Sequence, residues 1–108
     1  MAYPLYAACR FGNVADLEHL LSTGHDVNHL FSSRKTPLWL ATVNGHYHCA
    51  RLLVENGADL NAKTKDGLTV LHRAAMDGNF ALLRLFVEAG AHVSPSVLPW
   101  AAQYDRVD

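Results

Sequence analysis

Two series of glycines share one period, and this regularity constrains the fold more than any other feature of the chain. The period is 33 residues, set by Gly12, Gly45 and Gly78 in one series and by Gly24, Gly57 and Gly90 in the other. A repeat of about 20 to 50 residues is typical of proteins built from stacked units, and about three units are needed for stability. The 108 residues are therefore predicted to form one short stack.

Each unit contains the apolar spacing of two short helices. In the first unit Val14, Leu17 and Leu21 lie on one face of a helix. Gly24 ends that helix, because a residue without Cβ adopts the left-handed conformation most readily. In the second unit Thr36 occupies the N-cap position, where its hydroxyl can accept a hydrogen bond from the helix backbone.

The segments between units, residues 25–35 and 58–68, are predicted to form extended hairpin-like loops. Asp66-Gly67 is a favourable turn sequence for the second loop. The first loop has Ser33-Arg34 at the equivalent place, so Arg34 must either adopt a strained positive φ or change the type of turn.

The pattern Asp-Gly-x-Thr-x-Leu-His-x-Ala-Ala, followed by Gly, Leu-Leu and Gly-Ala-Asp-x-Asn-Ala, resembles the ankyrin repeat. The resemblance covers residues 3 to about 94, and every copy has both glycines, an Ala-rich first helix and an apolar second helix. It implies an all-α solenoid of stacked helix-turn-helix pairs with hairpin loops. The whole chain is expected to be a single ankyrin-repeat domain, with repeats at about 1–30, 31–63 and 64–96.

Four positions depart from or retain the family pattern in an informative way. Tyr3 stands where the family prefers a capping threonine, so the first helix is expected to lack a cap that contributes about 1 kcal/mol. Tyr6 and Trp39 replace the family histidine, which is retained only as His72. The resemblance implies that His72 forms hydrogen bonds that connect neighbouring repeats.

The repeat register fails beyond Ser94. Residues 97–102 resemble residues 70–75 at a spacing shorter than the period, which indicates a degenerate half-repeat or cap over residues 97–108. Either the chain is a fragment of a longer array or this tail is an atypical cap, and we favour the fragment.

Composition argues against several classes of function. The net charge of −1 provides no basic excess for nucleic acid, and no apolar run approaches the roughly 20 residues that span a membrane. Cys9 and Cys49 lie among apolar neighbours and are expected to be buried free thiols. The sequence also lacks a secretory signal, so we expect an intracellular protein, cytoplasmic or nuclear.

The seven histidines do not form a convincing metal or catalytic site. His46 and His48 are two residues apart and point in nearly opposite directions on a helix, and the family resemblance favours a structural role for His46. Asp66 and Asp77 lie near His72 in the sequence, but no suitable nucleophile accompanies them. We therefore expect neither an enzyme nor a bound cofactor or metal.

The resemblance instead implies a binding surface made of the first helices and the hairpins, which together form a concave groove. The residues expected to contact a partner are Arg10, Phe11, Phe31, Ser33, Lys35, Trp39, Val43, Asn44, Lys65, Asp66, Leu68, Arg73, Met76 and Asp77. Several are apolar, and exposed apolar patches usually mark interaction sites. For Phe31 and Leu30, burial between repeats and exposure remain equal alternatives, whereas Trp39 is expected to be partly buried with one edge exposed.

These observations predict a protein–protein interaction module that binds a partner protein in the groove, as an adaptor or a substrate-recognition part of a larger protein. One alternative is the substrate-recognition array of an ankyrin-and-SOCS-box type ubiquitin ligase receptor, and another is an architectural spacer that binds no partner in its groove. Self-association through uncapped ends is a further expectation, because Val14, Leu17 and Leu21 would be partly uncovered in the first repeat.

Overall fold

The computed structural model describes residues 3–91, which form six short α-helices, one 3-10 turn and no β-strand. The elements are α1 (Tyr3–Phe11), α2 (Val14–Ser22), η1 (Ser32–Arg34), α3 (Pro37–Val43), α4 (Tyr47–Glu55), α5 (Val70–Asp77) and α6 (Phe80–Glu88). The predicted all-α class is confirmed. The degenerate half-repeat expected at residues 97–108 lies outside the described residues.

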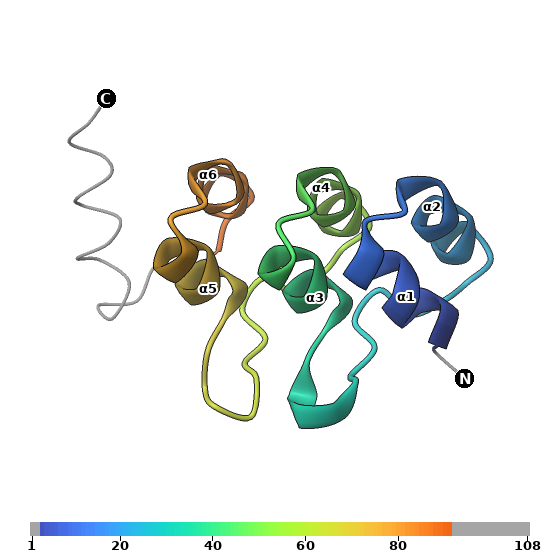
Figure 1. The fold of residues 1–108 in the computed structure, drawn as a ribbon, viewed down its shortest axis with the longest axis horizontal. Coiled ribbons are helices and arrows are strands. Elements are labelled where there is room, and N and C mark those ends of the chain that lie inside the picture. The colour runs from blue at the N-terminus through green and yellow to red at the C-terminus, as the bar shows by residue number, and fades with distance from the viewer. Residues whose placement is uncertain (1–2, 92–108) are drawn as a thin grey trace.

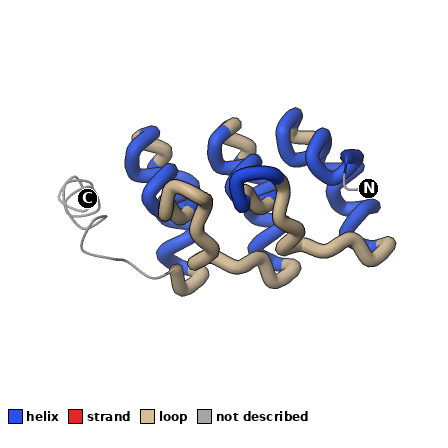
Figure 2. Tube along the Cα trace, turned by 90° about the horizontal axis from the view of Figure 1, so that it is seen from below, coloured by secondary structure: helices blue, strands red, loops and turns tan. Residues whose placement is uncertain are grey.

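The helices form two parallel rows (Figure 1). One row contains α1, α3 and α5, and the other contains α2, α4 and α6. Each helix packs against its partner within the repeat and against the equivalent helix of the adjacent repeat. The two long loops project from the edge of the stack on the side of the first row (Figures 1 and 2).

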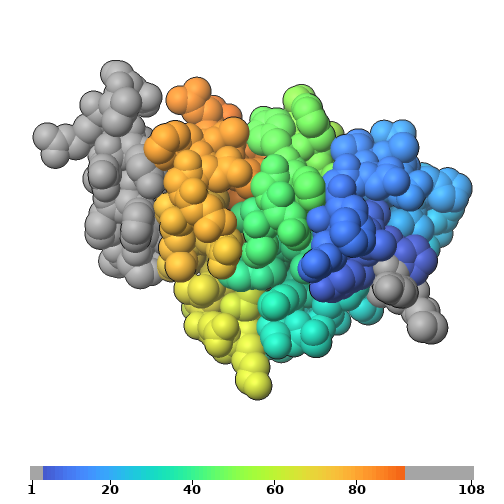
Figure 3. All heavy atoms as spheres, viewed as in Figure 1, coloured from blue at the N-terminus to red at the C-terminus, as the bar shows by residue number. Residues whose placement is uncertain are grey.

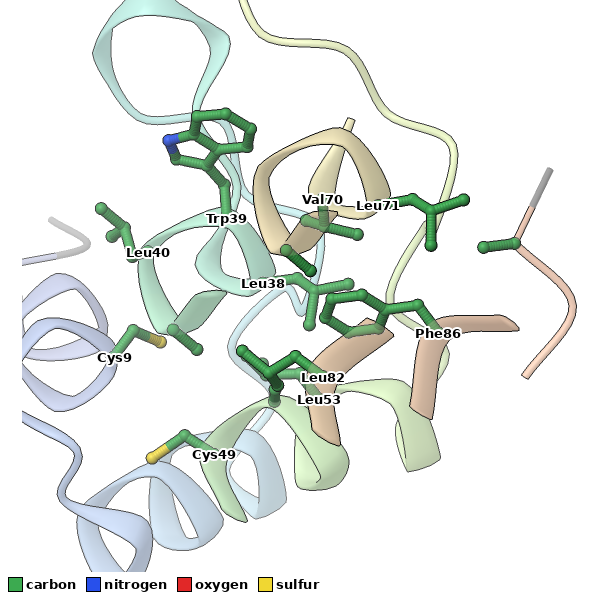
Figure 4. Close-up of a cluster of buried hydrophobic side chains, with 14 of the residues drawn as sticks. Cys9, Leu38, Trp39, Leu40, Cys49, Leu53, Val70, Leu71, Leu82 and Phe86 are labelled. Carbon is green, nitrogen blue, oxygen red and sulfur yellow. The ribbon is translucent and has the colours of Figure 1, made fainter. Parts of the chain in front are cut away.

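The core repeats with the period of the sequence. Leu5, Leu38 and Leu71 occupy the same position in successive repeats, and each is at most 1% exposed. The close-up in Figure 4 shows Leu38 between the two rows, near Leu53 of α4. This core position is therefore filled by the same side chain in all three repeats.

Leu17 was expected to be partly uncovered in the first repeat, and this expectation is wrong, because its side chain is fully buried. It lies on the face of α2 directed into the stack, where α2 contacts both α1 and α4. Val14 and Leu21 are half-buried, in agreement with the expectation for these two residues. Less apolar surface is consequently exposed at this end than the sequence suggested.

His46 connects the first two repeats. Its Nε2 donates a hydrogen bond to the carbonyl oxygen of Arg10, at 2.9 Å. The imidazole lies so close to Gly12 that a Cβ there would be 2.6 Å from His46 Nδ1, and Gly12 also has a φ of +76°. Only glycine fits this position without displacement, and the structural role predicted for His46 is confirmed.

A second connection between the same repeats runs through Asn28. Its Oδ1 accepts a hydrogen bond from the backbone nitrogen of Asp59 at 2.7 Å. Its Nδ2 donates to the carbonyl oxygen of Gly57 at 3.4 Å. One amide side chain therefore holds the loop after α2 against the loop after α4.

Both cysteines are buried free thiols, as expected. Burial, reinforced by the proximity of Cys49, raises the pKa of Cys9 to about 12. Burial also raises the pKa of the Cys49 thiol. Both side chains therefore remain protonated and act as small apolar groups in the core.

Candidate functional site

The first row of helices and the tips of the two hairpins form one continuous surface, which we call the inner face. It consists of α1, α3 and α5 together with residues 30–35 and 63–68. Each tip is closed by a backbone hydrogen bond, from Phe31 N to Lys35 O at 2.8 Å and from Thr64 N to Leu68 O at 2.9 Å. The expected loops are thus present as hairpins.

The two tips are joined to each other by their backbones. The nitrogen of Lys65 donates a hydrogen bond to the carbonyl oxygen of Ser33 at 2.9 Å. Figure 3 shows the tips, coloured cyan and yellow, packed side by side. The inner face is therefore preformed across two repeats.

The first tip contains residues other than glycine at positive φ, a conformation that is unfavourable for them. Ser33 and Arg34 have φ values of 61° and 59°, whereas the equivalent tip of the third repeat uses Gly67 at 80°. Of the two alternatives for Arg34, the structure thus has the positive φ. Ser33 shares this conformation, within the 3-10 turn η1.

A row of exposed side chains runs across the helices of the inner face. Arg10, Val43 and Met76 occupy the same position in successive repeats, and all three are exposed. Val43 is 37% exposed, Met76 51% and the adjacent Phe11 72%. Asn44 is exposed beside Val43. The inner face therefore presents apolar groups from all three repeats to solvent.

The inner face also carries polar side chains, in addition to the exposed Val43 and Met76, which we call the apolar row. Ser33, Lys35, Lys65 and Asp66 are exposed on the tips, and Leu68 is half-buried there. On α5, Arg73 Nε donates to Asp77 Oδ2 at 2.9 Å, with both side chains about one-third exposed. The pair orients both side chains on α5, although an exposed ion pair contributes only about 0.5 kcal/mol.

Trp39 does not have the exposed edge that the sequence suggested, because only 7% of its surface is accessible. Its indole extends from α3 on the side away from Leu38 (Figure 4) and belongs to the main hydrophobic core. The central helix α3 packs against both α1 and α5. Neighbours on both sides therefore cover a position that the family pattern places on the groove.

The structure separates the two residues whose burial was left open. Leu30 is 48% exposed. Phe31 is half-buried, with its ring edge-on to Tyr6 at a centroid distance of 5.2 Å and to His29 at 4.8 Å. Phe31 thus anchors the first tip to α1, and Leu30 remains available at the surface.

His72 caps its own helix. Its Nδ1 contacts Thr69 Oγ1 at 2.8 Å and accepts a hydrogen bond from the Thr69 nitrogen at 3.3 Å. Burial, and to a smaller extent Lys63, lowers the pKa of His72. These bonds lie within the third repeat, and a connection from His72 to a neighbouring repeat stays a prediction.

Residues 3–91 contain no group of three or more His, Cys, Asp or Glu side chains arranged to hold a metal ion. In the same part of the chain, no helix is long and apolar enough to cross a membrane.

Sequence reasoning did not identify two shallow hollows, one of which shares Phe11 with the inner face. One lies between α4 and α6, lined by Tyr47, Phe80, Ala81, Arg84, Leu85 and Glu88. The other lies at the first repeat and includes Pro4, Ala7, Phe11, Asp16 and His19. Phe80 is the first residue of α6 and is 55% exposed. An aromatic residue at the start of a helix was the sequence feature that could have indicated the first hollow.

Comparison with known proteins agrees with this geometry. The family model for ankyrin repeats matches residues 5–97 in three copies. The chain belongs to the ankyrin repeat family. Ankyrin repeats are a general protein–protein interaction module.

Among solved structures, the ankyrin repeat domain of human ASB11 is similar to this chain, with a TM-score of 0.77 and 36% sequence identity. The match covers 82% of this chain but 40% of the ASB11 chain. This ankyrin array therefore spans less than half the length of that structure. A search of curated proteins gave no match.

Proposed function

We propose that the chain is a recognition module that binds a partner protein on its inner face, as an adaptor or substrate-recognition part of a larger protein. The observation that supports this most directly is the exposed apolar row, with Val43 and Met76 in adjacent repeats and Phe11 beside it. Exposed apolar groups at equivalent positions of a rigid stack are suited to receive side chains of a partner.

The rigidity of this surface is part of the proposed mechanism. The tips are joined by the bond from Lys65 to Ser33, and the first two repeats are held together by the connections through His46 and Asn28. Little conformational entropy is lost on binding when the surface is already ordered. Affinity comes from the apolar row, and the surrounding charges discriminate between partners.

Photo-cross-linking tests the location of the site. A photoreactive amino acid replaces Met76 on the inner face or, as a control, the exposed Arg51 on α4, and cross-linked proteins are identified from cells. We expect a set of proteins at position 76 that is absent at position 51 and is lost on adding Val43→Gln. Equal sets at both positions, or partners at position 51 alone, would contradict the inner-face site.

The likeness to the ankyrin repeat domain of human ASB11 is consistent with a second candidate, the substrate-recognition array of an ankyrin-and-SOCS-box type ubiquitin ligase receptor. In that case the proteins cross-linked at position 76 should accumulate when ubiquitination is inhibited in cells. An architectural spacer, the remaining alternative, should give no specific cross-links at either position.

A further inference from the structure

The charges of the described residues are divided between two sides of the stack. Residues 3–91 contain eight basic and eight acidic side chains. Six of the basic ones lie on the inner face, where only Asp66 and Asp77 are acidic. The six are Arg10, Arg34, Lys35, Lys63, Lys65 and Arg73.

The remainder of the described chain has the opposite balance. The second row of helices and the loops that follow α2 and α4 contain six acidic side chains and only two basic ones, Arg51 and Arg84. The acidic ones are Asp16, Glu18, Asp26, Glu55, Asp59 and Glu88. Arg51 is paired with Glu55 at 3.3 Å. A nearly neutral molecule therefore has one basic side and one acidic side.

The basic residues of the two tips are held near one another by the fold. The hydrogen bond from Lys65 N to Ser33 O joins the tips directly, so Lys65 lies beside the segment that contains Arg34 and Lys35. All three side chains are exposed. Like charges held together repel one another in the free protein, and an oppositely charged partner would relieve this repulsion.

We propose that the inner face selects protein segments that combine acidic residues with apolar side chains. This inference rests on the function proposed above and specifies the chemistry of the partner. The apolar side chains of the segment contact the row of Val43 and Met76, and its carboxylates lie against Lys35 and Lys65 on the tips. Because charge interactions are screened over about 10 Å at moderate salt, the local basic side governs this preference and not the net charge of −1.

A nucleic acid is the competing anionic partner, and two features of the inner face disfavour it. Asp66 on the second tip and Asp77 on α5 lie among the basic residues, where they would repel a continuous phosphate backbone. The apolar row also has no counterpart on a phosphate surface. A protein segment with mixed acidic and apolar residues matches both features.

Selection from a random peptide library displayed on phage tests the proposal with the full chain. The selected peptides are then measured by fluorescence anisotropy against three variants. Lys35→Gln/Lys65→Gln removes two inner charges, and Val43→Gln/Met76→Gln removes the apolar row without changing charge. Ala15→Glu/Ala81→Glu is the matched control, because it lowers the net charge as much as the lysine variant does, at exposed positions in the first turns of α2 and α6.

We expect the selected peptides to be enriched in both acidic and apolar residues. Their affinity should fall about tenfold in the lysine variant, stay within about twofold in the control, and weaken as salt increases.

Other outcomes separate this inference from the proposed function. Peptides that are lost in the Val43→Gln/Met76→Gln variant but show no acidic enrichment would overturn the charge preference and leave the inner-face site in place. Peptides unaffected by any inner-face change would contradict both. Tighter binding of a single-stranded RNA or duplex DNA probe that depends on Lys35 and Lys65 would instead identify a nucleic-acid site and overturn the proposal.

Discussion

The second and third repeats have the same backbone plan but stabilise it with different side chains. In the third repeat the tip turns at Gly67, whereas in the second it turns through Ser33 and Arg34 at positive φ. The strained tip has Phe31 packed edge-on against Tyr6, where the third repeat has only Thr64, whose Oγ1 accepts a long hydrogen bond from Leu68 N at 3.4 Å. The comparison indicates that an aromatic anchor to the preceding repeat compensates for an unfavourable turn.

The helix starts of the same two repeats differ as well. Thr36 accepts a hydrogen bond from Trp39 N at 3.1 Å, and Trp39 itself is directed into the core. Thr69 and His72 form a reciprocal capping box. The third residue of the helix is thus used for packing in one repeat and for capping in the next.

Of the changes that test this comparison, removing the aromatic anchor should have the largest effect on the free energy of unfolding. We expect Phe31→Ala to lower the free energy of unfolding by about 2 kcal/mol, because a half-buried ring and its contact with Tyr6 are lost. The equivalent change in the third repeat, Thr64→Ala, should have an effect below about 1 kcal/mol. Urea unfolding of both variants measures the difference, and equal losses would contradict the role of Phe31 as an anchor.

Removing the caps should separate the two helix starts. Thr69→Ala is expected to lower the free energy of unfolding by about 1.5 kcal/mol, and Thr36→Ala by about 1 kcal/mol, since only the former disrupts a reciprocal pair of bonds. Thermal unfolding followed by circular dichroism provides the measurement. A larger loss of unfolding free energy for Thr36→Ala would mean that the position of Trp39 depends on its cap more than the position of His72 depends on Thr69.

Exchanging the turn residues sharpens the comparison further. Gly67→Arg should destabilise the chain by about 1 kcal/mol, because it places a side chain at a φ of 80°. Arg34→Gly should stabilise it by less, since glycine also gives the unfolded chain more conformational freedom. Urea midpoints of both variants test this, and destabilisation by Arg34→Gly would indicate that the arginine side chain itself stabilises the tip.

The smallest expected effect is a pH dependence confined to the third repeat. Burial lowers the pKa of His72 below its usual value of 6.5, so the unfolded chain binds a proton more readily than the folded one. The contribution of His72 is therefore complete above pH 6.5 and decreases as the pH falls below it.

The control for this prediction is His72→Gln, which retains a capping-box side chain but cannot be protonated. Urea midpoints are measured at about pH 8 and about pH 5.5, on either side of the usual histidine pKa. The midpoint should decrease from the higher to the lower pH by more in the original chain than in the variant. An equal fall in both would contradict the contribution of His72.

Much of the fold could be predicted because its determinants are local. The glycine period and the apolar spacing within each helix depend on residues close in sequence, and the structure places helices where these signals predicted them. Trp39 and Leu17 were harder to place, because their burial depends on helices about one period away in the sequence.

The candidate site shows the same limit. The exposure of Val43 and Met76 follows from their position within one helix, and it could be predicted from the repeat alone. The contact between the tips through Ser33 and Lys65 could not, because it joins two loops whose sequences differ. The hydrogen bond from His46 to Arg10 likewise depends on how two repeats lie against each other.

The packing of each helix row only against its nearest neighbours has a consequence for how the chain opens. Within residues 3–91, the central pair α3 and α4 is covered on two sides, whereas α1 and α2 contact one neighbouring repeat. Local unfolding in such an arrangement starts at an end and advances one unit at a time. Amide hydrogens of α3 and α4 should consequently exchange with solvent more slowly than those of α1 and α2.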